Sequence, residues 1–187
     1  MARKIHREPV IDSRMSFPDA IAGTTAPPSV LADLCLLAVS YYAFDGALHQ
    51  GQLVVHRRLR DELREVFAII QGTRFPVAKV VPIVHYGWSD EASMADNNTS
   101  AFNYRTVAGS VRLSRHAAGM AIDVNPRQNP VIYADGRSLP PGASYLPRAG
   151  GALKRDSRIV REFLARGWQW GGDFADLQDY HHFDKKV

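Results

Sequence analysis

The stretch SRHAAGMAIDVNP, residues 114–126, contains two side chains that could share a metal ion. His116 precedes Asp123 by seven positions, in a frame of small residues that ends in Asn-Pro. Zinc accepts both imidazole nitrogens and carboxylate oxygens, and a catalytic zinc takes three protein ligands and keeps one position open. The same residues could instead be an ordinary loop histidine and an aspartate that caps a turn. The spacing alone does not decide between these alternatives.

The C-terminal segment DYHHFD, residues 179–184, is the obvious source of a third ligand. It places His181 and His182 side by side, and neighbouring side chains of a strand point to opposite faces, so only one of them should reach a metal. Asp179 lies three residues before His182. A carboxylate at this place can accept the proton of a metal-activated water and later pass it to the leaving amine. The segment therefore offers a base and a ligand together.

Both segments resemble the M15 family of metallopeptidases. SRHAAGMAID matches the signature S-x-H-x-x-G-x-A-x-D, and GWQWGGDFADLQDYHHF is similar to the G-W-x-W-G-G-D-W…D-x-x-H-F ending of the VanY-like and CwlK-like branch. These relatives are the zinc D-Ala-D-Ala carboxypeptidases and L-alanyl-D-glutamate endopeptidases of bacterial walls and phage endolysins. NNTSAFNYR and AIDVNPRQNP also resemble that branch, so the resemblance spans roughly residues 50–184.

The resemblance implies a role for each position that matches the motifs. His116, Asp123 and His182 correspond to the ligands of one zinc ion, and Asp179 corresponds to the general base. His181 is then assigned to the outer face of its strand. The implied reaction is hydrolysis of a peptide bond by a metal-activated water whose proton passes to Asp179.

Two further residues take roles from the same resemblance. Arg105, in FNYR, corresponds to an arginine that polarises the scissile carbonyl or steadies the oxyanion; the alternative is a surface arginine. Ser114 corresponds to the motif serine, which either contacts the substrate or shapes the turn. The chain departs from the family at Phe174, where relatives often have tryptophan, and in NYRTV, where more distant relatives have G-[YF]-R-[PS].

Three helices are expected to support these residues. In RRLRDELREVFAII the apolar residues recur at helical spacing, and Gly72 ends that helix. A second helix is capped by Asp156 and runs through Arg166. A third is predicted from Ser29 to about Tyr42, in an apolar stretch that holds the single cysteine of the chain.

Short strands alternate irregularly with these helices. The strands are predicted at residues 51–56, 75–84, 101–105, 119–125 and 131–136. Without regular βαβ units, this order favours an α+β fold: one compact domain with a small, mainly antiparallel sheet flanked by helices. The resemblance implies the zinc fold shared by Hedgehog and the D,D-peptidases. Residues 1–28 are predicted to be an extended N-terminal arm before a peptidase domain at 29–187, and the Pro/Gly-rich loop 139–151 is expected to be functional.

Composition sets wide limits on the function. The chain has 187 residues, 45% of them hydrophobic, which suits one globular domain. Its net charge of +4 favours anionic partners without choosing among them. With one cysteine the chain forms no internal disulfide, and its longest apolar run is too short to span a bilayer.

The sequence therefore predicts a zinc-dependent peptidase, with one ion per chain, that hydrolyses peptidoglycan stem peptides. It would act as a D-Ala-D-Ala carboxypeptidase or an L-Ala-D-Glu endopeptidase; the alternative is a non-catalytic zinc-containing binding domain of the same fold. We expect a monomer that does not bind nucleic acid, because no basic-aromatic platform accompanies the charge. The resemblance places the activity at the bacterial cell wall, although no signal peptide is visible, and a phage endolysin released by membrane rupture would need none.

Overall fold

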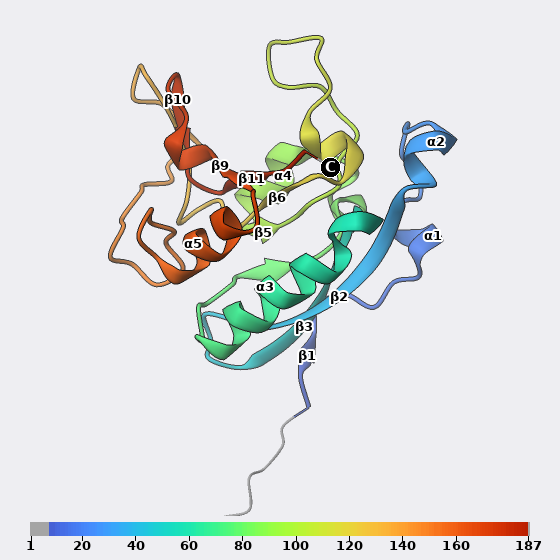
Figure 1. Ribbon diagram of the computed structural model, residues 1–187, viewed down its shortest axis with the longest axis horizontal. Helices are drawn as coiled ribbons and strands as arrows, with labels where there is room; N and C mark the ends of the chain where they lie inside the picture. The colour runs from blue at the N-terminus through green and yellow to red at the C-terminus, as the bar shows by residue number, and fades with distance from the viewer. Residues whose placement is uncertain (1–7, 187) are drawn as a thin grey trace, which may run out of the picture.

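Four small sheets and a set of helices form an α+β fold, as predicted (Figure 1). The structure is a computed structural model, and it describes residues 8–186. Three of the sheets within this range have three strands each, and the fourth has two. Most strand pairs are antiparallel. None of the helices in the described range is long and apolar enough to span a bilayer.

The largest sheet is built on a long hairpin near the N-terminus. Strands β2 (Leu34–Tyr42) and β3 (Leu48–His56) pair antiparallel along their whole length, and the short β1 (Val10–Ile11) adds to β3 in parallel. The helix predicted from Ser29 to Tyr42 is therefore wrong. Only the single turn α2 (Pro28–Leu31) is helical, because the following apolar run gains a strand partner in β3.

Helix α3 (Arg60–Gly72) lies across this hairpin, as the helical spacing predicts. It is preceded by a 3-10 turn, η1 (Arg57–Leu59). Its inward face consists of apolar side chains that are almost completely buried: Leu63, Val66, Phe67 and Ile70. Burying such a side chain contributes about 1.5–3 kcal/mol. Gly72 is the last residue of the helix, as predicted.

The sheet that carries the candidate site lies on the other side of the same hydrophobic core. Its strand order is β6 (Ala121–Asp123), β11 (His182–Asp184), β9 (Gln169–Trp170), and all pairs are antiparallel. Helix α5 (Arg158–Ala165) packs Phe163 on Phe183 of β11, with ring centroids 4.0 Å apart. The cap of α5 is Ser157, one residue after the predicted Asp156, because the Ser157 hydroxyl accepts the Val160 amide hydrogen.

The remaining elements are short and connect these layers. They are α1 (Phe17–Ala20), β4 (Lys79–Val80), η2 (Ile83–Tyr86), α4 (Asp90–Ala95), β5 (Asn98–Thr99), η3 (Arg115–Ala118), β7 (Val131–Tyr133), β8 (Ser138–Leu139), η4 (Gly171–Asp173) and β10 (Leu177–Asp179). The strand predicted over 75–84 is reduced to β4, which has a proline on either side, at 76 and 82. The segment 101–105 forms no strand, although its backbone is tied to neighbouring segments.

The N-terminal segment packs on the hairpin over residues 10–26. The Gln52 side chain of β3 accepts from Ser13 and from the Met15 amide, and Ala20 and Ala26 are buried. Residues 1–7 of the predicted arm lie outside the described residues. The division of the chain at residue 28 stays a prediction.

His49 of the hairpin contacts Asp12 of this segment and Asp45 of the hairpin turn. Ionisation of His49 therefore makes the free energy of unfolding depend on pH. His49 Nδ1 lies 3.0 Å from Asp12, and Nε2 lies 3.2 Å from Asp45. Burial by itself lowers the pKa of His49, but the two carboxylates outweigh it and raise that pKa. The resulting stabilisation is fully present below the unfolded pKa of about 6.5 and is lost as pH rises through the folded-state pKa.

We therefore expect the stability difference between the wild type and His49→Gln to shrink as pH rises from about 6 to about 9, by about 1 kcal/mol or less. Urea unfolding of the metal-free protein at both pH values measures it. Asp12→Asn should weaken the same pH dependence. A difference that grows with pH would contradict the assignment.

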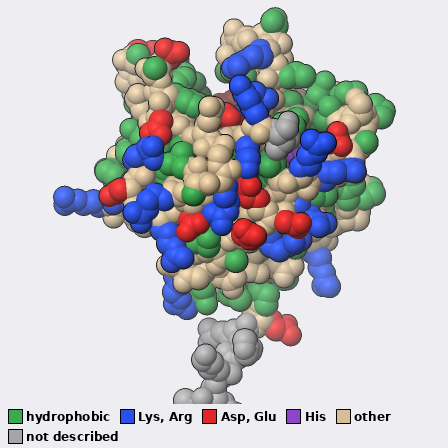
Figure 2. Space-filling model, in the orientation of Figure 1, with side chains coloured by type: hydrophobic (Ala, Val, Ile, Leu, Met, Phe, Trp, Pro, Cys, Tyr) green, Lys and Arg blue, Asp and Glu red, His purple; other side chains and the backbone are tan. Residues whose placement is uncertain are grey.

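The face seen in Figure 2 carries both signs of charge close together. On and near α3, Arg64 Nη1 lies 2.6 Å from Asp61, and Arg57 Nε lies 3.8 Å from Asp33. The basic run HRRLRDELR is thus partly neutralised within the fold. On this face basic side chains are interspersed with acidic ones and are not gathered into one basic patch.

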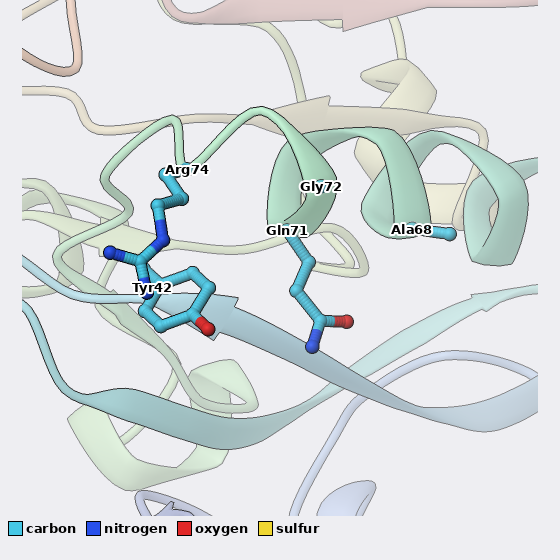
Figure 3. Close-up of a pocket in the computed structure, with 5 residues that line it drawn as sticks. All are labelled: Tyr42, Ala68, Gln71, Gly72 and Arg74. Carbon is cyan, nitrogen blue, oxygen red and sulfur yellow. The ribbon is translucent and has the colours of Figure 1, made fainter. Parts of the chain in front are cut away.

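An open depression of about 360 Å³ lies where α3 ends (Figure 3). The Arg74 guanidinium lies over the Tyr42 ring there, 4.1 Å from its centroid, which is a cation–π contact. Ala68, Gln71 and Gly72 complete the lining. These residues offer no acid–base pair, and none of them belongs to the predicted site.

Candidate metal centre

Strand register places two of the three predicted ligands opposite each other. In the antiparallel pair of β6 and β11, His182 faces Asp123, and the next pair is Phe183 with Ile122. Side chains alternate along a strand, so the apolar pair enters the core while the ligand pair lies on the other face. Phe183 and Ile122 are fully buried.

The third predicted ligand comes from the 3-10 turn η3. Ser114 caps this turn by accepting the His116 amide hydrogen, and Gly119 ends it with a φ of +66°. A Cβ at Gly119 would lie 2.7 Å from the His56 backbone nitrogen, so only glycine fits there. His116 Nδ1 lies 2.5 Å from the Ala101 carbonyl oxygen, which turns Nε2 toward the other two side chains.

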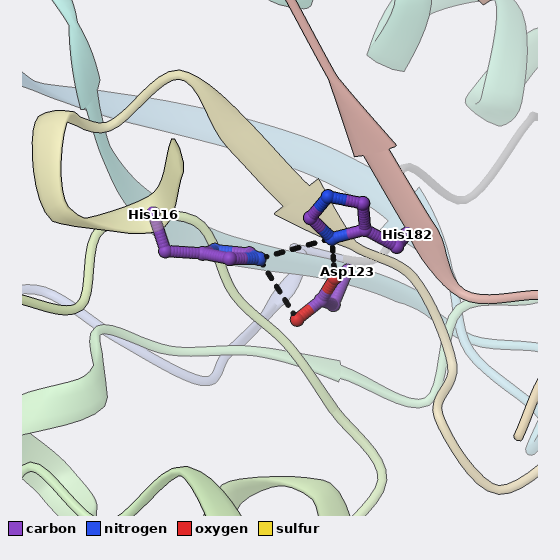
Figure 4. Close-up of side chains that lie close together, drawn as sticks. All are labelled: His116, Asp123 and His182. Atoms are coloured by element: carbon purple, nitrogen blue, oxygen red, sulfur yellow. Dashed lines mark hydrogen bonds and ion pairs between the residues drawn. The ribbon is translucent and has the colours of Figure 1, made fainter. Parts of the chain in front are cut away.

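His116, Asp123 and His182 converge on one point (Figure 4). His116 Nε2 lies 3.2 Å from Asp123 Oδ2 and 3.2 Å from His182 Nδ1, and His182 Nδ1 lies 2.9 Å from Asp123 Oδ1. Ligands about 2.0–2.1 Å from a tetrahedral zinc lie about 3.3 Å from one another. The donor set and its spacing therefore fit one zinc ion, and we call these three residues the ligand cluster.

The charges of the ligand cluster stabilise one another. Burial by itself raises the pKa of the Asp123 carboxyl, but the imidazoles of His116 and His181 hold it well below its usual range. Burial lowers the pKa of His182, yet hydrogen bonds to Asp123 and Asp184 raise it to about 10. The raised pKa favours a proton on His182 when no metal is bound. A metal ion must displace this proton in order to bind.

Asp184 belongs to the site, although it is not among the site residues predicted from the sequence. Its Oδ2 lies 3.3 Å from His182 Nε2, while His182 Nδ1 points into the ligand cluster. A carboxylate behind a ligating imidazole fixes the tautomer and the orientation of the ring. Residues i and i+2 of a strand share a face. The position of Asp184, two residues after His182, is therefore the feature of the sequence that indicates its place at the site.

Replacing Asp184 with alanine is expected to weaken zinc binding by about 10- to 100-fold. The His182 ring loses the acceptor that holds its Nε2 hydrogen. Competition with a zinc chelator measures the affinity, and Asp184→Glu should restore part of it. Equal affinities in the wild type and the alanine variant would show that Asp184 does not orient the ring.

Asp179, the predicted general base, is the last residue of β10. Residues of the GWQWGGD motif hold the backbone on either side of it. The Trp170 indole N–H donates to the Tyr180 carbonyl at 2.9 Å, and a Cβ at Gly171 would lie 2.4 Å from the Asp179 carbonyl oxygen. Because Gly171 has no side chain, its backbone can lie directly against the backbone of Asp179. Trp168 and Trp170 are both buried, so both belong to the core. The motif GWQWGGD is therefore a platform for the Asp179 turn.

Two buried side-chain atoms among residues 8–186 have no hydrogen-bond partner, and they belong to Arg105 and Asp179. Both residues were predicted to act on the substrate. Arg105 Nη2 pairs with Asp90 of α4 at 2.8 Å, while its Nε is unpaired. Leaving a buried polar atom unpaired costs about 1–3 kcal/mol, so such atoms call for an explanation.

Two other predicted residues are placed as follows. Ser114 Oγ accepts the His116 amide hydrogen at 3.2 Å and so shapes the turn; a contact with substrate stays a prediction. His181 does not lie on an outer face. It is 3% exposed, because it belongs to the turn before β11 and packs inward against Asn129. Phe174 lies at the site, with its ring centroid 6.2 Å from that of His182.

The Pro/Gly-rich loop 139–151 is fastened beside the Asp179 turn. The Tyr145 ring stacks on Tyr180 with centroids 3.6 Å apart, and the Tyr145 hydroxyl donates to the Leu153 carbonyl. The Asn129 amide donates to the Gly151 carbonyl at 2.9 Å. The loop thus contacts the residue next to the predicted base.

Residues 108–185 match the model of a peptidase family described as D-alanyl-D-alanine carboxypeptidase. The matched segment contains the ligand cluster, Ser114 and Asp179, whereas Arg105 lies just before it. The match is thus shorter than the predicted resemblance, which begins near residue 50. No curated protein and no solved structure matches the chain.

Proposed function

We propose that this chain is an M15 family peptidase that uses one zinc ion to hydrolyse the stem peptides of peptidoglycan at the bacterial cell wall, and the family match over residues 108–185 supports this assignment. The observation that carries the proposal is the ligand cluster, whose three donor atoms all lie within 4.8 Å of one another. His116 and Asp123 are buried and His182 is half-buried. A His/Asp/His set is a donor set of the kind that a catalytic zinc uses, with a fourth position taken by water or substrate.

When bound, zinc lowers the pKa of a water and polarises a carbonyl oxygen. Asp179 accepts the proton of the attacking water and returns it to the leaving amine. The Arg105 guanidinium favours the negative charge that develops on the scissile carbonyl oxygen. Asp90 holds this guanidinium through Nη2, at 2.8 Å.

Two bonds of the stem peptide are candidates. A D-Ala-D-Ala carboxypeptidase must recognise a terminal carboxylate, whereas an L-Ala-D-Glu endopeptidase must leave the groove open on both sides of the scissile bond. We propose that loop 139–151 decides between them, because Tyr145 anchors it on the residue next to Asp179.

Digestion of defined muropeptides, with products weighed by mass spectrometry, tests the proposal. The full chain is assayed as purified, after chelation, and after zinc is restored. Loss of one D-alanine identifies the carboxypeptidase, and scission after L-alanine identifies the endopeptidase. In either case chelation should abolish the product and zinc should restore it. Bound zinc without cleavage of any stem peptide would instead support a non-catalytic binding domain.

A further inference from the structure

Phe174 is an exposed aromatic side chain beside the ligand cluster. It is 36% exposed, whereas Trp168 and Trp170, which precede it in the same motif, are buried in the core. The Phe174 ring is tilted by 53° against the ring of His182, with the centroids 6.2 Å apart, which is within the range of aromatic contacts. Part of its apolar surface therefore faces solvent next to a proposed metal ligand.

The turn that carries Phe174 is closely packed. Phe174 directly follows η4, and its amide donates to the Gly171 carbonyl at 3.2 Å. A Cβ at Gly172 would lie 2.5 Å from the Trp170 ring, and Gly171 lies against the backbone of Asp179. The turn thus rests on a buried side chain and on the predicted base, and this packing fixes the place of the Phe174 ring.

The ligand cluster is reached from the side on which His182 lies. The His182 side chain is 13% exposed, whereas the side chains of His116 and Asp123 are 3% and 5% exposed. A substrate is therefore expected to approach the metal along His182. Because the Phe174 ring contacts that histidine, it stands beside this approach.

The two candidate bonds of the stem peptide share one apolar group. In D-Ala-D-Ala and in L-Ala-D-Glu, an alanine supplies the scissile carbonyl. This carbonyl is the group that a catalytic zinc polarises, so this alanine lies closest to the metal. Its methyl group is apolar, and contact with an exposed aromatic ring removes apolar surface of both partners from water.

We propose that Phe174 is a specificity-determining residue whose ring contacts the methyl group of this alanine. The ring then favours alanine over glycine at this position, whichever of the two bonds is cleaved. The proposal rests on the proposed peptidase function and deepens it, because it names the substrate group that this side chain recognises.

The test compares each stem peptide with a counterpart in which this alanine is glycine. For the zinc-loaded wild type, we expect kcat/KM to be about 10-fold higher with the alanine peptide. Phe174→Ala should lower kcat/KM about 10-fold with the alanine peptide and less than about 3-fold with the glycine peptide. Phe174→Trp should keep the preference. The control Ile11→Ala removes an exposed apolar side chain from β1, in the sheet of the N-terminal hairpin, and should change neither value.

Two readouts besides turnover complete the test. Elemental analysis should find equal zinc in the wild type and Phe174→Ala; loss of zinc would show that the ring shields the metal and would overturn the substrate contact. Calorimetry with the zinc-loaded Asp179→Ala protein gives the Kd of both peptides without cleavage. Adding Phe174→Ala should remove the preference for alanine from these Kd values.

The outcomes separate the two proposals. An equal preference for alanine with and without the ring, in kcat/KM or in Kd, would overturn the role of Phe174. A wild type that binds the stem peptides without cleaving them would overturn the peptidase function, while the Kd values still test the contact. A wild type that neither binds nor cleaves them would overturn both.

Discussion

Asp179→Ala is expected to lower kcat about 10²- to 10⁴-fold while zinc stays bound. Asp179 lies outside the ligand cluster, so its loss removes the proton acceptor and leaves the three metal donors in place. Its position at the end of β10 is set by backbone contacts from Trp170 and Gly171, which the substitution does not touch. Mass spectrometry of the products gives kcat, and elemental analysis gives the zinc content.

The matched control is Asp176→Ala, which removes an exposed carboxylate three residues earlier in the same segment. Its kcat should equal that of the wild type. Full activity in Asp179→Ala would mean that another group accepts the proton. Loss of zinc together with activity would mean that Asp179 is needed to form the metal site and would remove the evidence for a separate base.

His116→Ala is expected to abolish both zinc binding and cleavage. The substitution leaves two donors where a catalytic zinc takes three. It also removes the donor to the Ala101 carbonyl from a buried position, which adds a loss of about 1–3 kcal/mol in the free energy of unfolding of the metal-free protein. Zinc content, product formation and urea unfolding measure the three effects.

His85→Ala is the matched control, because His85 is an exposed histidine on another 3-10 turn, η2. It should leave zinc content and cleavage unchanged. Wild-type chain with zinc at about 1,000 times its Kd should also gain about 4 kcal/mol of stability, and His116→Ala should gain far less. An equal gain in both proteins would place the zinc elsewhere.

Local sequence patterns predicted the parts of the fold that depend on neighbouring residues. The apolar spacing of α3 and its end at Gly72 follow from helix geometry, and both are found. The apolar run of β2 is predicted to be a helix, and this prediction is wrong because a short buried segment has the same composition in either state. Pairing with β3, whose residues are 6 positions away beside the turn (Tyr42 with Leu48) and 22 positions away at the far end (Leu34 with His56), decides that it is a strand.

The site divides in the same way. His116, Asp123 and His182 could be selected because their types and order carry the metal chemistry, and the structure brings them together. The parts that support them depend on contacts across the fold. The contact of Asp184 with His182 and that of His181 with Asn129 arise from strand faces and turn packing, which the sequence does not specify.

X-ray diffraction from crystals of the zinc-loaded chain, recorded at the zinc absorption edge, would locate the metal directly. We expect one anomalous peak about 2.0–2.2 Å from His116 Nε2, His182 Nδ1 and a carboxylate oxygen of Asp123. We also expect Asp179 to stand beside the peak without ligating it. A peak held by other residues, or none at the ligand cluster, would contradict the proposed metal site.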